Sequence, residues 1–395
     1  MIGNPPYIDS ETMVKNMLEL REIYAKKFSY AKGNWDIFVI FIEEAFSILT
    51  ENGIFSFIIP NKLIAAKYAL QIRFYLATKT ILEIRDYSKV KVFLNADVYP
   101  ITLIMKNKNA TLHRKSSFTI MKDSKSVAQT LSVNSSSIIK DTYWDIFFQP
   151  NIIFRIIEKL ETSAISQNNI SIFGSATVNE AYKIKEIVTE ENNSNDELKF
   201  INTGTIDPYF IKWGKESCSY IKNKYFKPIV KKSNLRKISE TRLKQAESAK
   251  IIVAGMSARF EAVIDLAGEY IAGKSTTIIL GDKIYLKFLL GIINSKSASF
   301  WLNIKFNSLK MSGGYLNVGT NELSLLPIPT ATPAQQQEII TLVDKILAAK
   351  KASAGSATNH SDSKADTTAL EHKIDELVYK LYGLTEEEIA IVEGK

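Results

Sequence analysis

Apolar residues in the first hundred positions alternate between helical and strand-like spacing, and this alternation limits the possible folds most. In chain order the segments are a helix after Asn34 that Asn52-Gly53 closes, a strand at 54–59, a helix at 63–77 and strands near 81–87 and 99–105. Each assignment follows from the period at which the apolar residues recur. Alternating strands and helices predict an α/β fold with a mostly parallel sheet covered by helices.

The rest of the chain changes character twice. Residues 111–139 are polar and rich in serine, so we expect a connection there; residues 140–330 show short strands and turns, typical of an α+β domain. Beyond three prolines, apolar residues near 339–346 and 370–381 predict two amphipathic helices joined by a flexible linker at 352–364. The predicted domains are 1–110, a connection at 111–145, a second domain at 146–330 and a helical region at 331–395.

Composition excludes several classes of protein. One cysteine, Cys218, and three histidines leave no disulfide framework and no metal site. The apolar runs are far shorter than the ~20 residues that a bilayer span requires, and no export signal is visible. The sequence therefore predicts a globular cytoplasmic protein without a membrane span.

Positive charge is concentrated in the middle of the chain. The formal net charge is +8, and residues 201–260 alone hold thirteen Lys and Arg residues against four Asp and Glu residues. Residues 331–395 hold eleven acidic residues and seven lysines. A cationic face on the middle domain is the pattern expected for a partner rich in phosphate.

The chain opens with a short motif that suits the chemistry of an aromatic amine. In Asn4-Pro5-Pro6-Tyr7 the Asn4 side-chain oxygen and the Pro5 carbonyl can accept both hydrogens of an exocyclic amine, whose lone pair is otherwise delocalised. The prolines fix that carbonyl, and Tyr7 offers a ring face to a flipped base. The alternative is a Pro-Pro turn beside an incidental tyrosine.

With the blocks that follow it, the motif resembles the adenine-N6 DNA methyltransferases that carry an Asn-Pro-Pro-Tyr motif and a TaqI-like specificity domain, as in type IIG restriction-modification enzymes. The blocks occur in the family's order, and they lie at 33–36, 52–60, 92–104, 200–206, 251–256, 268–279, 311–316 and 377–393.

The resemblance implies a function and roles for particular residues. It implies methyl transfer from S-adenosylmethionine to an adenine flipped out of double-stranded DNA, with Asn4 to Tyr7 at the base. Phe93 would stack on the adenine from the other side, or it is a core residue at a strand end. Asp36 is a weak candidate for the cofactor side.

One part of the family pattern is missing. None of the 17 glycines forms a Gly-x-Gly, and the family's glycine-rich cofactor loop would precede Asn4. We therefore expect the C-terminal half of a Rossmann-like methyltransferase sheet, N-terminally truncated, which needs a partner polypeptide for its cofactor. The alternative is a sequence-specific DNA-binding subunit or remnant without catalysis. A third reading, methylation of a protein glutamine or an RNA base, is disfavoured by the basic domain.

The basic window supplies candidate DNA contacts. Aromatic residues interleave with Lys212, Lys215, Lys222 and Lys224, as expected where phosphates are neutralised beside a packed surface. The alternative is a solvated lysine face over an ordinary core. For reading bases we favour Arg259, whose guanidinium fits the guanine edge, and then Lys274.

Residues 268–275 match the pattern of a phosphate-binding loop in their letters, but the match does not predict such a loop. The loop interior is bulky, and the residues that follow favour a strand where such a loop requires a helix. We therefore expect β structure after residue 275 and no nucleotide hydrolysis.

Overall fold

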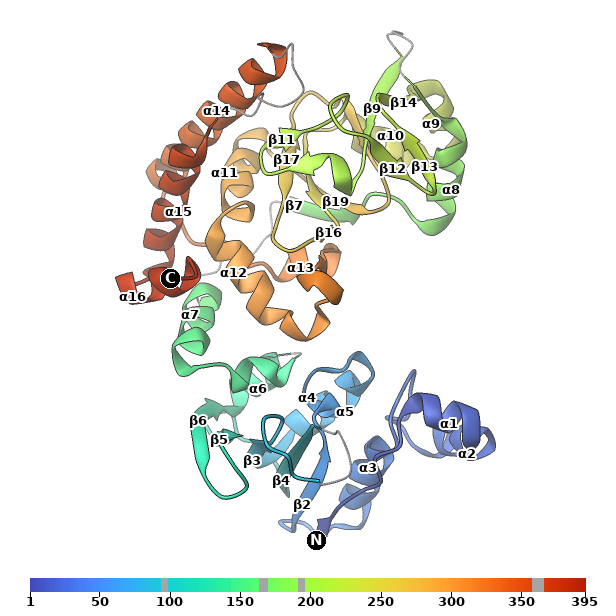
Figure 1. Ribbon diagram of the computed structural model, residues 1–395, viewed down its shortest axis with the longest axis vertical. Coiled ribbons are helices and arrows are strands. Elements are labelled where there is room, and N and C mark those ends of the chain that lie inside the picture. The colour runs from blue at the N-terminus through green and yellow to red at the C-terminus, as the bar shows by residue number, and fades with distance from the viewer. Residues whose placement is uncertain (94–98, 142, 163–169, 191–195, 357–365) are drawn as a thin grey trace. The chain divides into compact units, whose positions relative to one another are not determined.

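The computed structural model describes all residues except 94–98, 142, 163–169, 191–195 and 357–365 (Figure 1). The chain divides into two compact units, Met1–Phe154 and Arg155–Lys395. The boundary falls inside helix α7 (Asn151–Thr162). Each unit is described by itself.

Unit 1 is built on a six-stranded sheet in the order β1-β2-β4-β3-β5-β6. The strands are β1 (Ile2–Gly3), β2 (Ile54–Pro60), β3 (Lys79–Asp86), β4 (Pro100–Asn109), β5 (Lys115–Met121) and β6 (Val127–Asn134). The α/β fold is confirmed, but the expectation of a mostly parallel sheet is wrong, because only the β1–β2 and β3–β5 pairs are parallel. Residues 87–99 between β3 and β4 contain no crossover helix in their described part. β4 therefore returns antiparallel between β2 and β3.

The described part of unit 1 also contains α-helices, some of which pack against the sheet. They are α1 (Ser10–Asn16), α2 (Leu18–Lys27), α3 (Phe38–Ile48), α4 (Lys62–Ala65), α5 (Leu70–Ala77) and α6 (Ser135–Lys140). Phe38, Val39 and Ile42 of α3 and Phe55 of β2 are fully buried. The helix expected after Asn34 begins later, at Phe38, because the Ile37 amide donates to the Ile8 carbonyl and holds this segment against the residues after the motif.

The segment 111–145, expected to be a connection, contains β5, β6 and α6. β5 pairs in parallel with β3, and β6 pairs with β5 at the sheet edge. Its polar residues fit this position because an edge strand needs only one apolar face: Leu131 and Val133 are buried while Thr130 and Ser132 are exposed. The compact unit therefore extends past this segment to Phe154.

The described residues of unit 2 form two four-stranded sheets and three short two-stranded ribbons. The first sheet is β18 (Tyr270–Ala272), β9 (Glu197–Ile201), β14 (Pro228–Lys231) and β8 (Val188–Glu190); the second is β17 (Ala262–Asp265), β15 (Lys250–Ala254), β19 (Thr276–Gly281) and β7 (Ile170–Gly174). The ribbons are β10 (Ile206–Asp207) with β11 (Phe210–Ile211), β12 (Cys218–Tyr220) with β13 (Asn223–Tyr225), and β16 (Met256–Ser257) with β20 (Leu316–Asn317). These short strands confirm the α+β expectation.

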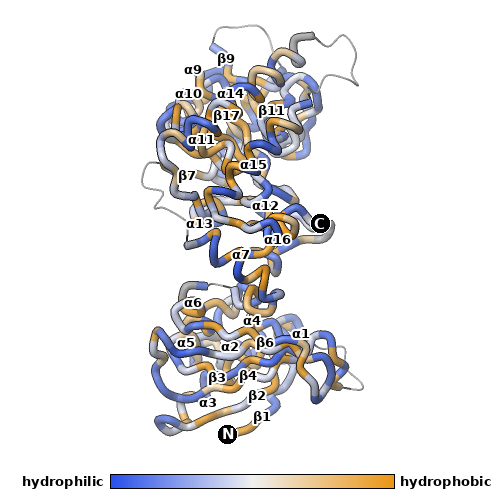
Figure 2. Tube along the Cα trace, turned by 90° about the vertical axis from the view of Figure 1, so that its left-hand side faces the viewer, coloured by the Kyte–Doolittle hydropathy of each residue, from blue (hydrophilic) through white to orange (hydrophobic). Residues whose placement is uncertain are grey.

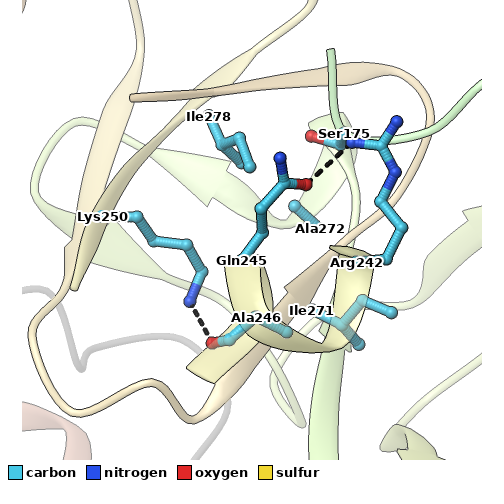
Figure 3. A pocket seen from close by; sticks show the side chains of 8 residues that line it. All are labelled: Ser175, Arg242, Gln245, Ala246, Lys250, Ile271, Ala272 and Ile278. Atoms are coloured by element: carbon cyan, nitrogen blue, oxygen red, sulfur yellow. Dashed lines mark hydrogen bonds between the residues drawn. The ribbon is translucent and has the colours of Figure 1, made fainter. Parts of the chain in front are cut away.

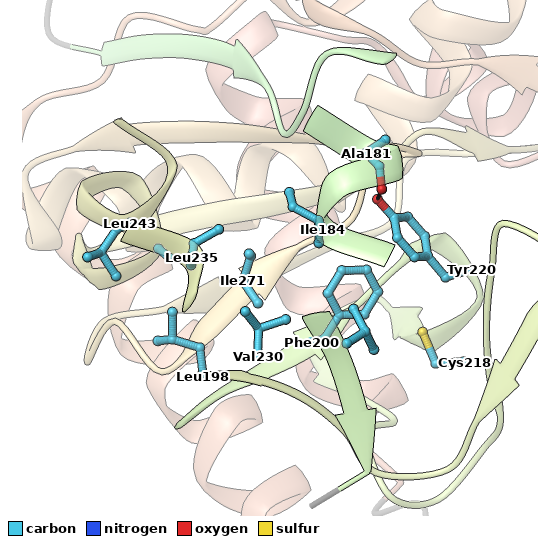
Figure 4. Close-up of a cluster of buried hydrophobic side chains, with 12 residues drawn as sticks. Ala181, Ile184, Leu198, Phe200, Cys218, Tyr220, Val230, Leu235, Leu243 and Ile271 are labelled. Atoms are coloured by element: carbon cyan, nitrogen blue, oxygen red, sulfur yellow. Dashed lines mark hydrogen bonds between the residues drawn. The ribbon is translucent and has the colours of Figure 1, made fainter. Parts of the chain in front are cut away.

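A dense apolar cluster lies between the first sheet and helices α8 (Val178–Ile187), α9 (Lys232–Ile238) and α10 (Glu240–Glu247). Phe200 of β9 and Val230 of β14 point into it, and the Tyr220 hydroxyl donates to the Ala181 carbonyl at 3.1 Å (Figure 4). This packing makes β12–β13 part of the folded unit.

The C-terminal part of unit 2 is helical. It consists of α11 (Lys283–Ile293), α12 (Lys296–Lys305), α13 (Thr320–Leu325), α14 (Pro333–Ser356), α15 (Thr368–Tyr382) and α16 (Glu386–Val392). The two predicted helices are confirmed as α14 and α15, and α11 was missed because it is apolar around most of its surface. The expected linker at 352–364 begins inside α14, and the rest of it falls outside the described residues. Figure 2 shows the alternation of apolar and polar residues along these elements.

Candidate functional site

The Asn-Pro-Pro-Tyr motif follows the carboxyl end of β1, a strand parallel to β2. Gly3 lies opposite Phe57, and a Cβ at Gly3 would approach that ring to 2.7 Å, so only glycine lets β1 pack this closely. Asn4 is exposed at the end of the strand and Pro5 is buried. Side chains at this edge of parallel strands are well placed to meet a ligand.

Tyr7 and Phe93 come together although 86 positions separate them in the chain. Their ring centroids lie 5.7 Å apart at an interplanar angle of 74°, an edge-to-face contact. The Tyr7 hydroxyl is buried and has no hydrogen-bond partner among the described residues. Burial raises the pKa of Tyr7 to about 12, so Tyr7 is a neutral phenol at physiological pH.

This contact has a consequence for any base that binds between the two rings. Two stacking distances of ~3.5 Å each require parallel rings roughly 7 Å apart. The observed rings are closer and nearly perpendicular. A planar ligand must therefore displace Phe93 before it can lie against both rings.

Asp36 lies beside this segment and is 4% exposed. One carboxylate oxygen accepts a hydrogen bond from the Ser10 amide at 3.0 Å, and the other accepts from the Lys62 ammonium at 2.8 Å. Asp36 thus holds the start of α1 and the chain after the motif in place. Lys62 was not predicted from the sequence, because nothing in the local pattern after β2 indicates its partner.

The structure separates the candidate lysines into two groups. Lys212 pairs with Asp207 at 3.1 Å and with Glu216 at 2.9 Å, and its side chain is 14% exposed. Lys215 lies over the Phe210 ring, 5.0 Å from its centroid. Lys222 and Lys224 are exposed, and no ion pair engages them in the part of the chain that the structure describes. Lys222 and Lys224 are therefore better placed for phosphate than Lys212.

Lys222 and Lys224 belong to the β12–β13 hairpin, whose turn is unusual. Ile221 and Lys222 both have positive φ, 40° and 67°, between the paired residues Tyr220 and Asn223. Such a turn ordinarily uses Asn-Gly, and a β-branched residue there is strained. Ile221 packs against the apolar cluster of the first sheet, which offsets this cost, and Lys222 faces solvent.

Arg259 and Lys274 lie on loops that hydrogen bonds join. The Gly255 amide donates to the Ser275 carbonyl at 2.8 Å, and the Thr203 hydroxyl donates to the same carbonyl. A Cβ at Gly255 would come within 2.3 Å of that oxygen, which requires glycine there. The Arg259 side chain is 61% exposed, with a 3.6 Å pair to Glu261, and Lys274 is exposed.

The formal phosphate-loop pattern forms no such loop. Residues 276–281 are strand β19, as expected, and residues 270–272 form strand β18. Asp265 instead organises this turn, because it accepts hydrogen bonds from the amides of Gly268, Glu269 and Tyr270. The segment is therefore structural.

A small pocket lies nearby, bounded by Lys250, Arg242 and Gln245 (Figure 3). Lys250 is 1% exposed and donates to Asp265 at 2.6 Å and to the Ala246 carbonyl at 2.5 Å. Burial lowers the pKa of Lys250, against the opposing effect of Asp265. Arg242 is held by Glu180 at 3.0 Å. Lys250 and Arg242 belong to the basic window at residues 201–260, but both make internal contacts.

Comparison with known proteins identifies both parts of the chain. Residues 1–93 match the Eco57I restriction-modification methylase family, and residues 198–328 match the TaqI-like C-terminal specificity domain. The type II restriction enzyme and methyltransferase RM.Eco57I of Escherichia coli is 26% identical over 204 residues, 48% of this chain and 20% of that protein. The type II methyltransferase M.BstVI of Geobacillus stearothermophilus is 27% identical over 111 residues, 28% of this chain and 19% of that protein.

Among solved structures, the type IIL restriction-modification enzyme MmeI in complex with DNA aligns with 100% of this chain and 56% of its own, at 11% identity and a TM-score of 0.43. The type IIG restriction endonuclease BpuSI aligns with 97% of this chain and 54% of its own, at 11% identity and a TM-score of 0.34.

The two family matches define the class as a DNA methylase of the restriction-modification type. Within that class, the chain carries an Eco57I-type restriction-modification methylase domain and a TaqI-like C-terminal specificity domain. The alignments cover about a fifth of the length of the two curated relatives. No described helix is long and apolar enough to cross a membrane.

Proposed function

We propose that this chain provides the target-adenine site and the DNA-recognition domain of a site-specific adenine-N6 DNA methyltransferase. The observation that carries the proposal is the position of Asn4 to Tyr7 at the carboxyl end of a parallel strand, with the ring of Phe93 against Tyr7. The family matches on both units support it.

The chain's own residues would act on the adenine amine. The Asn4 side-chain oxygen and the Pro5 carbonyl accept its two hydrogens, which favours the more tetrahedral nitrogen of the transition state. Pro6 keeps the Pro5 carbonyl in an extended geometry. Tyr7 and Phe93 hold the flipped ring, with Phe93 displaced from its observed contact.

Methyltransferases of this family use S-adenosylmethionine, which supplies the methyl group. Asp36, the one candidate, already has both carboxylate oxygens hydrogen-bonded, to Ser10 and Lys62. We therefore propose that another polypeptide segment holds most of the cofactor and that Asp36 positions the motif.

Unit 2 would bind double-stranded DNA. Lys222, Lys224 and Lys274 are exposed and suited to phosphates, Lys215 is partly exposed on the same stretch, and Lys212 would act indirectly through its ion pairs. Phosphate contacts fix position on the duplex, and base contacts give specificity.

The experiment replaces Asn4 by alanine at the chromosomal locus and maps N6-methyladenine across the genome. A strain without the chain defines which sequence motif depends on it. Asn4→Ala should abolish methylation at that motif, while the purified variant should still bind duplex DNA. The matched control is Asn16→Ala, an exposed asparagine at the end of α1. Methylation retained in the Asn4→Ala strain would reject the assigned role.

A second function, DNA binding without catalysis, is supported by Asp36, whose two carboxylate oxygens already accept hydrogen bonds from Ser10 and Lys62. The two functions differ in the strain that lacks the chain. If no methylated motif disappears there, while the purified chain binds a specific duplex, the non-catalytic function is correct.

A further inference from the structure

The short β16–β20 ribbon brings together two segments that the sequence keeps far apart. Met256 pairs with Asn317 and Ser257 with Leu316, and the Val318 amide donates to the Gly255 carbonyl at 2.9 Å. The turn at 311–315 closes on itself, because the Met311 amide donates to the Tyr315 carbonyl at 2.8 Å. Arg259 therefore follows one strand of a ribbon whose other strand follows Tyr315.

Large apolar side chains are exposed on this ribbon and its turn. Met256 is 51% exposed, Met311 is 42% exposed and Tyr315 is 49% exposed. Cations lie beside them in the chain: Lys310 precedes Met311 and is exposed, and Arg259 is 61% exposed. Exposed apolar residues among unburied cations fit a partner that presents both negative charge and apolar edges.

Two hydrogen bonds with helix α12 hold the loop that carries Arg259. The Asn303 side-chain amide donates to the Ala258 carbonyl at 2.9 Å, and the Phe260 amide donates to the Ser299 hydroxyl at 3.3 Å. Phe260 itself is buried. The residues on both sides of Arg259 are thus fixed, and the guanidinium projects from a rigid loop. The Glu261 pair at 3.6 Å is weak enough to yield to a better acceptor.

We propose that the β16–β20 ribbon is the sequence-reading element of unit 2 and enters the major groove of duplex DNA. Arg259 donates to a guanine edge there, and Met256 and Tyr315 contact the apolar part of neighbouring base pairs, such as a thymine methyl. A two-stranded ribbon fits the width of the major groove. Asn303 is a positioning residue. This inference rests on the proposed function, since it assumes duplex DNA as the partner.

The β12–β13 hairpin has a different role. Lys222 lies in the hairpin turn and Lys224 lies in β13, and neither has a large exposed apolar neighbour within the two strands. Point charges of this kind bind phosphate without regard to sequence. The two elements therefore predict opposite responses to mutation.

The experiment selects duplexes with a randomised centre on the full chain and sequences the bound pool. Wild-type protein should enrich one sequence, with at least one guanine. Arg259→Ala should lose discrimination at one base position by about 10- to 100-fold, with a nearly unchanged salt dependence. The double variant Lys222→Ala/Lys224→Ala should keep the enriched sequence and weaken binding to all duplexes alike.

Other outcomes would contradict either the reading role of the ribbon, DNA binding by the chain or the positioning role of Asn303. If Arg259→Ala enriches the wild-type sequence, or if wild-type protein binds without enrichment, the reading role of the ribbon is wrong while DNA binding stands. If the wild-type chain binds no duplex, both proposals fail. Asn303→Ala, which changes no charge, should reduce discrimination at the Arg259 position while the salt dependence and the cooperative unfolding transition are retained; full discrimination would remove its positioning role.

Discussion

At the scale of single residues, burial decides which polar groups are available for function. Lys212, Arg242 and Lys250 belong to the basic window by sequence, yet each is committed to a carboxylate. Glu180, the partner of Arg242, shows how such a pair keeps a carboxylate ionised. Burial alone would raise its pKa, but hydrogen bonds from Arg242 and Thr177 lower it to about 2. The carboxylate therefore stays ionised and the pair stays formed at physiological pH.

Asp375 in α15 shows the opposite shift and leads to a prediction. Burial raises its pKa to about 6, although the Lys296 amide at 2.8 Å and the charges of Lys296 and His372 oppose the shift. An acid with a raised folded-state pKa destabilises the fold once it ionises, so the cost is absent below its unfolded pKa of about 4 and complete above about 6.

Asp375→Asn keeps an acceptor for the Lys296 amide and removes the charge. At pH 8 it should increase the free energy of unfolding by about 1–3 kcal/mol. The gain should shrink as the pH falls from 6 to 4. Denaturant titrations at several pH values measure this, with Asp344→Asn in α14, whose side chain is 48% exposed, as the control. A gain independent of pH would show that folding does not raise the pKa of Asp375.

At the scale of elements, the β12–β13 hairpin has a strained turn and exposes two lysines, Lys222 and Lys224. Its turn residues Ile221 and Lys222 have positive φ, which costs roughly 1–2 kcal/mol for each non-glycine residue. The register from Cys218↔Tyr225 to Tyr220↔Asn223 leaves no other residues for the turn. The buried side chains of Cys218 and Tyr220 fix that register.

Lys222→Gly should therefore separate stability from binding. Glycine adopts this φ without strain, so the free energy of unfolding should rise by about 0.5–1 kcal/mol. Affinity for a duplex of arbitrary sequence should fall several-fold at low salt, because one phosphate contact is lost. Thermal unfolding and fluorescence anisotropy measure the two effects.

Lys380→Ala in α15 is the control for this variant, because it removes one exposed lysine from the acidic C-terminal part of unit 2. It should leave DNA affinity unchanged. If Lys222→Gly binds as tightly as wild type, the hairpin does not contact the backbone of the DNA.

At the scale of the whole molecule, positive and negative charge are segregated within unit 2. Unit 1 holds the Asn4 to Tyr7 motif, and unit 2 holds both the basic window and the acidic helices α14 to α16. The modest net charge of +8 conceals this division. Association with DNA should therefore depend on a few local cations rather than on the total charge.

We expect the affinity of the whole chain for duplex DNA to fall about 10- to 1000-fold between 50 and 200 mM salt, as for a protein with a few phosphate contacts. A logarithmic plot of affinity against salt should be linear, and Lys222→Ala/Lys224→Ala should reduce its slope by about 2. Titrations at four salt concentrations test this. An affinity that does not respond to salt would contradict the proposal that the chain binds duplex DNA through its phosphates.

The sequence by itself determined the elements whose signals are local. The strands at 54–60 and 100–109, the helices α14 and α15 and the strands of the false phosphate loop follow from the period of apolar residues and from β-propensity, which act over a few positions. The Asn4 to Tyr7 motif was recognisable because its chemistry lies in four adjacent residues. The strands at 115–121 and 127–134 were missed because edge strands can be polar.

Tertiary structure alone decided which of these pieces meet. The antiparallel return of β4, the contact of Tyr7 with Phe93, the occupation of Asp36 by Lys62 and the pairing of β16 with β20 all join residues far apart in the chain. Such contacts depend on chain reversal and on competition between partners for each charge, and neither leaves a periodic trace in the sequence. For this protein, the sequence indicated the chemistry, and the fold selected which side chains are free to perform it.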